Sequence, residues 1–157
     1  MGDDVMDNET GIEAAPTNRT PVHLWIVGIV SLLWNAFGAT DYTMTMTRNA
    51  TYLAAVTPAQ TAYFDSFPAW EVALWALGVW GALAGSVLLL MRRRIAVAAF
   101  AVSLFGLAGS TLYQFVIAPP PEALRGPTMI VMNLVIWAVA IALLVYARAM
   151  RARGMLR

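Results

Sequence analysis

Residues 69–117 read AWEVALWALGVWGALAGSVLLLMRRRIAVAAFAVSLFGLAGSTLYQFVI and contain two long apolar runs, 69–91 and 95–117, separated by three consecutive arginines. Each run is near the roughly 20 residues that an α-helix needs to cross a hydrocarbon core of about 30 Å. Because backbone groups in lipid must bond within their own segment, each run is expected to be helical. The tight basic turn Arg92-Arg93-Arg94 then joins the two helices into a hairpin.

Two further apolar runs, about 22–46 and 127–147, lie on either side of this hairpin. Hydrophobic residues make up 60% of the 157-residue chain and charged residues 12%, whereas soluble domains average about 45–50% and about 25%. The sequence therefore predicts an all-α fold, an integral membrane four-helix bundle over residues 21–157, with the lipid bilayer as its surroundings.

The segment 1–20 differs from the rest, because it is polar and acidic and lacks the apolar periodicity that packed helices need. Such a composition is typical of a disordered tail. A cleavable signal peptide would instead begin with positive charge. We therefore expect residues 1–20 to form a disordered acidic tail on the cytoplasmic side.

The connections between the runs predict one further short helix. Thr57-Pro58-Ala59-Gln60 has the form of a capping box with proline at the first helical position, which predicts a helix over about 58–66. Its aromatic residues suit a helix that lies in the membrane interface, within the first periplasmic loop. Residues 118–126 contain three consecutive prolines and are expected to form a stiff, extended loop.

The ten arginines are distributed unevenly between the two sides of the predicted membrane. Two, Arg48 and Arg125, fall on one side. Eight fall on the side of the basic turn, namely Arg19, Arg92, Arg93, Arg94, Arg148, Arg151, Arg153 and Arg157. Because arginines concentrate on the cytoplasmic side, we expect both termini in the cytoplasm. The compact chain with short loops favours a multi-pass protein of the bacterial inner membrane.

Several activities are excluded by what the chain lacks. It has no cysteine, no lysine and a single histidine, His23, which rules out thiolate metal sites, multi-histidine centres, P-loops and Schiff-base chemistry within one chain. The net charge of +1, with basic residues beside apolar runs, predicts no nucleic-acid partner. Asp41 and Glu71 could be drawn as an acid–base pair, but no nucleophile, oxyanion hole or metal set accompanies them. We predict neither an enzyme nor a cofactor.

Polar side chains on the predicted helices share one depth in the membrane. At about 1.5 Å per residue, the outer half of the bundle holds six of them. They are Asn35, Asp41, Glu71, Tyr113, Gln114 and Asn133. The inner half holds only small hydroxyls such as Ser31, Ser86 and Ser103.

Two interpretations of this shared depth remain open, because polar groups in lipid need partners or water. In the first, the six residues form a polar pocket open to the periplasm, with Asp41 and Glu71 as acceptors and aromatic walls from Trp34, Trp75 or Tyr113. In the second, the carboxylates are hydrated at the interface and neutralised by Arg48 and Arg125. Asn35 and Asn133 then bond between helices.

Small residues predict where two of the helices touch. The second helix contains Gly81-x-x-x-Gly85 with Gly78 nearby, and the third contains Gly106 and Gly109. Stripes of this kind allow close backbone approach, so these two helices are expected to pack tightly. The alternative is that glycines are simply common in membrane helices.

Two methionine pairs, Met44 with Met46 and Met129 with Met132, lie at the predicted periplasmic ends of their helices. Thioethers are soft ligands that select Cu(I), but methionine is more often an adaptable packing residue. No histidine accompanies the four, so the sequence predicts no metal site and leaves copper binding undecided.

Several short motifs carry a resemblance to a known group of proteins. They are WNAFGATDY at 34–42, TRN at 47–49, TP at 57–58, AYF at 62–64, FPAW at 67–70, WG at 80–81 and the basic turn. With them the chain resembles a group of small bacterial four-helix membrane proteins that are often labelled sugar transporters. The resemblance covers most of residues 22–157. It implies the four-helix topology and, as an expectation, sugar transport.

Two hypotheses about function follow. The chain is either a transporter-like or solute-binding protein for a polar small molecule such as a sugar, working as a homo-oligomer because four helices alone rarely enclose a path. Alternatively, it is a non-catalytic accessory subunit that packs its glycine stripes against a larger membrane-protein partner.

Overall fold

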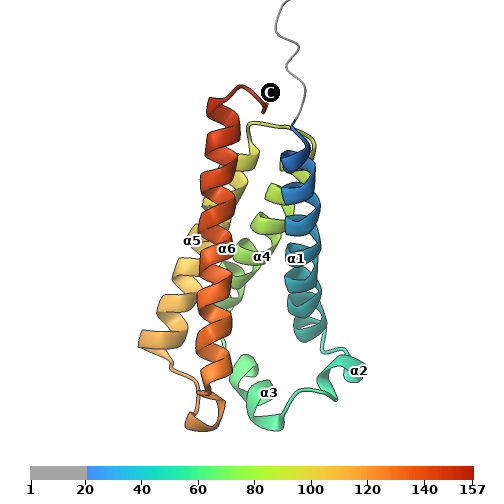
Figure 1. Cartoon of the computed structure of the whole chain (residues 1–157). Coiled ribbons are helices and arrows are strands. Elements are labelled where there is room, and N and C mark those ends of the chain that lie inside the picture. The colour runs from blue at the N-terminus through green and yellow to red at the C-terminus, as the bar shows by residue number, and fades with distance from the viewer. Residues whose placement is uncertain (1–20) are drawn as a thin grey trace, which may run out of the picture.

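The computed structural model describes residues 21–157. Four long helices form a bundle (Figure 1): α1 (Val22–Met46), α4 (Ala69–Leu90), α5 (Ala96–Leu112) and α6 (Pro127–Ala152). Each helical segment is long and apolar enough to cross a membrane, and the described part of the chain contains no strand. The predicted all-α four-helix architecture is confirmed. The expectation for residues 1–20 lies outside the described residues.

Two helix boundaries differ from the predicted ones. The third helix is α-helical only to Leu112 and continues as the π-helix η1 (Tyr113–Ile117). The fourth runs past residue 147 to Ala152, because its buried stripe continues through Ala147 to Met150 at helical spacing. The other boundaries agree with the sequence to within one residue.

The connection between α1 and α4 contains two short helices. The predicted one is α3 (Pro58–Asp65), and both bonds of its capping box are present: Gln60 N donates to Thr57 Oγ1 at 3.3 Å and Thr57 N to Gln60 Oε1 at 3.1 Å. The other, α2 (Ala50–Leu53), was not predicted. Its Asn49 N-cap accepts from Tyr52 N at 3.0 Å.

The proline-rich loop is less extended than expected. A single 3₁₀ turn, η2 (Glu122–Leu124), follows the prolines. Arg125 Nε closes the loop on itself by donating to the Pro120 carbonyl oxygen at 2.7 Å. We call the end of the bundle that carries α2, α3 and η2 the loop end.

The opposite end carries the turn Arg92–Arg94 and the C-terminus, and we call it the arginine end (top of Figure 1). Gly154 takes a φ of 70°, which turns the chain back toward the α4–α5 turn. Arg94 N then donates to Arg157 O at 2.9 Å, and Arg157 N to Arg92 O at 2.6 Å. This fold-back buries Leu156 completely in an apolar core. The core also contains Leu24, Leu89, Phe100, Leu143 and Met150.

All five glycines expected to pack lie at the α4–α5 contact. A Cβ added at Gly106 would lie 2.5 Å from Gly78 N and 2.6 Å from Leu74 O, both backbone atoms. A Cβ at Gly81 would lie 3.1 Å from Ser103 Cα. Added carbons at Gly85 and Gly109 would lie 2.7 Å from the side chains of Phe100 and Leu74, and one at Gly78 would lie 3.5 Å from Leu107 N. The two backbones approach closely because these positions carry no side chain.

The four long helices pack in the order α1–α4–α5–α6, and α1 and α6 have no extensive contact. They are linked near the arginine end, where His23 Nδ1 and the Tyr146 hydroxyl lie 2.6 Å apart. Toward the loop end the two helices stand apart (Figure 1). The bundle is therefore tightly packed at the arginine end and open at the loop end.

Candidate functional site

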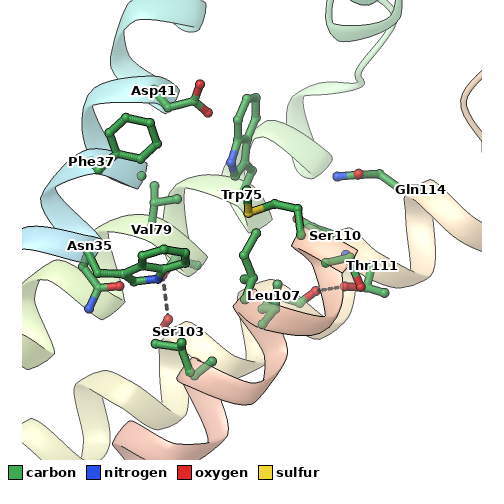
Figure 2. Close-up of a pocket in the computed structure, with 18 of the residues that line it drawn as sticks. Asn35, Phe37, Asp41, Trp75, Val79, Ser103, Leu107, Ser110, Thr111 and Gln114 are labelled. Carbon is green, nitrogen blue, oxygen red and sulfur yellow. Dashed lines mark hydrogen bonds between the residues drawn. The ribbon is translucent and has the colours of Figure 1, made fainter. Parts of the chain in front are cut away.

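A cavity of about 500 Å³ lies in the loop half of the bundle. It is lined by residues of all four long helices, of α3 and of η1. Figure 2 shows Phe37 and Asp41 of α1 on one side, Gln114 and Thr111 on the other, and Trp75 of α4 between them. The cavity therefore lies between the helices in the loop half of the bundle.

Aromatic rings form much of the cavity wall. Helix α3 contributes Phe64, and Phe67 lies between α3 and α4; their ring centroids lie 5.6 and 6.2 Å from that of Trp75. Tyr42 of α1 packs edge-on against the same indole at 5.0 Å. Trp34 and Phe37 of α1 also line the space. The sequence predicts that the rings of α3 lie in the membrane interface, and the tertiary fold in addition brings Phe64 against Trp75.

Four of the six polar residues predicted to form a pocket line this cavity: Asn35, Asp41, Gln114 and Asn133. Tyr113 does not line it, being 6% exposed and packed against Trp70 at 5.1 Å. Tyr113 and Gln114 are adjacent in η1 and point in different directions, and of the two only Gln114 lines the cavity.

The two asparagines differ in their hydrogen bonds. Asn35 Nδ2 donates to Ser86 Oγ at 2.9 Å and to Ala82 O at 3.3 Å, so its amide N–H groups tie α1 to α4. The Asn133 side chain makes no hydrogen bond to any part of residues 21–157 that the structure describes. Asn35 therefore acts between helices, whereas the Asn133 amide remains available to a ligand.

Neither Arg48 nor Arg125 neutralises the carboxylates, contrary to the second interpretation of the sequence. Arg48 Nη2 pairs with Asp65 Oδ1 at 2.8 Å, and Arg125 bonds the backbone of its own loop. Asp41 instead accepts a hydrogen bond from the Tyr52 hydroxyl of α2. That bond raises the pKa of Tyr52 to about 12, because a proton donated to a carboxylate is harder to remove.

Glu71 is not at the hydrated interface, as the second interpretation required, nor does it line the cavity. Its side chain is 0% exposed. Gln114 Nε2, from the cavity wall, approaches Glu71 Oε1 at 3.5 Å. Glu71 thus lies directly behind the cavity wall, next to the lining residues Gln114 and Ser110.

Several hydroxyls in the wall are occupied by internal bonds. Ser103 Oγ donates to Gly78 O at 2.6 Å. Thr111 Oγ1 donates to Leu107 O at 2.7 Å and accepts from Trp137 Nε1 at 3.1 Å. Thr111 was missed in the sequence because hydroxyls are frequent on these helices and its neighbours are set by the fold.

The two methionine pairs do not form a common site. Met132 lines the cavity, whereas Met44 lines a separate hollow of about 240 Å³ between α1 and α4. Among residues 21–157, no group of three or more histidine, cysteine, aspartate or glutamate side chains is arranged to hold a metal ion.

The cavity combines aromatic walls with a few polar groups that have free bonding capacity, chiefly Asp41, Gln114 and Asn133. Its volume lies within the range of about 300–1,000 Å³ that is usual for small-molecule sites. Such an arrangement can bind an organic molecule that has both an apolar face and hydroxyl or amine groups. No protein family, curated protein or solved structure was found to match this chain.

Proposed function

We propose that the chain is a transporter-like or solute-binding membrane protein whose cavity holds a small polar molecule of the sugar or polyol class. The observation that carries the proposal is the 500 Å³ cavity in which aromatic rings and unoccupied polar groups face one space. Sugars present C–H faces that pack on aromatic rings and hydroxyls that both donate and accept hydrogen bonds.

Each class of wall residue has a distinct part in this binding. Trp34 and Trp75 offer ring faces on which a sugar ring can stack. Asp41 accepts hydrogen bonds from ligand hydroxyls, and the amides of Gln114 and Asn133 both donate and accept. The same sugar-like chemistry agrees with the resemblance described from the sequence.

We further propose that the loop end faces the periplasm and the arginine end the cytoplasm of a bacterial cell. The support is the concentration of arginines around Arg92–Arg94 and the C-terminus. The cavity would then be accessible from outside, while the packed core around Leu24, Leu89 and Leu156 closes the inner end. Transport would require that core to open, or a second copy of the chain to complete the path.

The accessory-subunit hypothesis has less support. That hypothesis requires the glycine stripes to contact a partner protein. In the structure the α4–α5 contact within the chain already covers these glycines, which are Gly78, Gly81, Gly85, Gly106 and Gly109. The structure therefore removes the surface from which that hypothesis was drawn.

Ligand binding can be tested with purified protein in lipid nanodiscs. A panel of hexoses, pentoses and glycerol is titrated while tryptophan fluorescence is recorded, because Trp34 and Trp75 line the cavity. We expect a saturable change in tryptophan fluorescence with at least one sugar or polyol of the panel. The affinity of Asn133→Ala for that ligand should be about tenfold lower, because the variant loses about one hydrogen bond.

The matched control is Glu122→Gln, since Glu122 is exposed in η2 and away from the cavity wall. Its affinity should equal that of the wild type. If no member of the panel gives a saturable signal, or if Asn133→Ala binds as tightly as the wild type, the proposal is wrong.

A further inference from the structure

Glu71, in the first turn of α4, is a buried carboxyl group with too few partners. Its Oε2 atom makes no hydrogen bond within the described residues, and Oε1 has only the 3.5 Å contact from Gln114 Nε2. Buried carboxylates are normally paired or hydrogen-bonded, because a bare charge in apolar surroundings is unfavourable. A permanent negative charge at Glu71 is therefore poorly supported.

A second partnerless atom lies at the same place. Ser110 of α5 lies beside Glu71, and its Oγ is likewise buried without a hydrogen-bond partner in the described part of the chain. Ser110 also lines the cavity, as does Gln114. A proton on Glu71 would remove the buried charge.

Within residues 21–157, no ion pair stabilises the charged form of Glu71. Among the described residues, Tyr63 of α3 is close enough to Glu71 for the two groups to interact electrostatically. The ion pair found in residues 21–157, Arg48 with Asp65, does not include it. The start of α4 favours negative charge at this position. Burial disfavours the charged form of Glu71, whereas the helix dipole favours it.

The other two long helices contribute little charge at this end. From α1, Asp41 lines the cavity and accepts a bond from Tyr52. Helix α6 carries no charged side chain before Arg148. The protonation state of Glu71 is therefore governed mainly by its immediate neighbours, Ser110 and Gln114.

We propose that Glu71 is a proton-binding site coupled to the cavity through Gln114. A charged carboxylate accepts an N–H from the Gln114 amide, whereas a neutral carboxyl group can donate its O–H to Gln114 Oε1. Protonation thus reverses the polarity of this contact and turns the amide. Since Gln114 projects into the cavity (Figure 2), a ligand meets a different polar group in each state.

This coupling rests on the proposed function, which supplies the class of ligand. It makes ligand binding in the cavity dependent on proton binding at Glu71. By linkage, a ligand that prefers one orientation of Gln114 shifts proton binding, and pH shifts ligand affinity by the same factor. In a transporter, the proton at Glu71 would be the coupling ion.

Infrared spectroscopy of the wild-type protein in nanodiscs tests the proton site without any ligand. At neutral pH we expect one protonated carboxyl band per chain that shifts when glutamate is labelled with ¹³C at the side-chain carboxyl. The band should be absent in Glu71→Gln, which preserves shape, and unchanged in Glu122→Gln, an exposed control. A spectrum without a label-sensitive band, or a band that persists in Glu71→Gln, would overturn the proposal.

The link through Gln114 is tested separately. Tryptophan emission of the wild type should titrate over the same pH range as the infrared band, because Trp75 and Gln114 line one cavity. In Gln114→Leu the band should remain and the pH dependence of emission should disappear. Unchanged emission titration in Gln114→Leu would contradict the coupling. Because the infrared measurement needs no sugar, a failure of sugar binding leaves it intact and the two proposals fail distinguishably.

Discussion

Asn35 and Asn133 are chemically identical side chains that line one cavity, but within residues 21–157 only Asn35 forms hydrogen bonds to other parts of the protein. The first holds two helices together, and the second is free to meet a ligand. A similar division separates the carboxylates. Asp41 faces the cavity and holds Tyr52 of α2, whereas Glu71 is enclosed behind Gln114. The role of each of these polar side chains therefore depends on its hydrogen-bond partners and not on its residue type.

Alanine at the two asparagines should separate packing from binding. Asn35→Ala removes the bonds to Ser86 and Ala82 and should lower the free energy of unfolding by about 0.6–1.7 kcal/mol, the usual range for polar contacts between membrane helices. Asn133→Ala should leave stability unchanged. Unfolding in mixed micelles measures both, and equal losses would contradict the division of roles.

The bond between Tyr52 and Asp41 predicts a pH-dependent attachment of α2 to α1. Because the pKa of Tyr52 is raised from 10.0 to about 12, its contribution to stability is complete below pH 10 and is lost as the pH rises to about 12. In an absorbance titration of the tyrosines, Tyr52→Phe should have one fewer group with a raised pKa than the wild type. In Asp41→Asn the pKa of Tyr52 should fall toward 10, and an unchanged titration in that variant would exclude the bond.

At the scale of elements, the contact between α4 and α5 is the best-defined feature. Gly106 packs against the backbone of α4 at Gly78 and Leu74, which cannot move aside. The π-helix η1 then follows α5 at the loop end, where Tyr113 is buried and Gln114 faces the cavity. π-Turns of this kind are frequent at functional sites. The close α4–α5 contact is thus followed directly by the π-helical turn η1 at the cavity.

Glycine-to-alanine substitutions should measure this packing. Gly106→Ala places a Cβ 2.5 Å from Gly78 N and should cost about 1–3 kcal/mol through overpacking. Gly38→Ala in α1 is the matched control, because no atom lies within 4 Å of the added carbon. It should be neutral or stabilising by up to about 1 kcal/mol, since alanine favours helix. Thermal unfolding in detergent compares them, and similar melting temperatures for both would argue against a tight α4–α5 contact.

At the scale of the whole molecule, the bundle has one closed end and one open end. The C-terminal fold-back and the core around Leu156 close the arginine end. The weak contact between α1 and α6 leaves space at the loop end. A cavity that stops at a packed core is reachable from one side only, so the proposed function depends on which side of the membrane the loop end faces.

Cysteine labelling should establish that orientation, because the chain contains no cysteine. Single cysteines at Ala55, exposed at the loop end, and at Ala152, exposed near the arginine end, are compared in intact cells. A membrane-impermeant maleimide should label Ala55→Cys at once and Ala152→Cys only after permeabilisation. The reverse pattern would place the cavity on the cytoplasmic side.

The sequence alone determined the helical segments and their approximate ends, because lipid leaves an apolar run of this length no other way to satisfy its backbone. It also located the glycine stripes, since close approach needs residues without side chains. The capping box at Thr57 was equally local, and its bonds are present in the structure.

Only the tertiary structure decided which polar residues share the cavity. The rotation of each helix sets that choice, and it separates Gln114 from Tyr113 although they are adjacent in sequence. The fold also paired Arg48 with Asp65 rather than Asp41, and brought α3 onto Trp75. These contacts join residues that are far apart along the chain or on different helix faces. Their geometry depends on how whole helices pack, which local patterns do not specify.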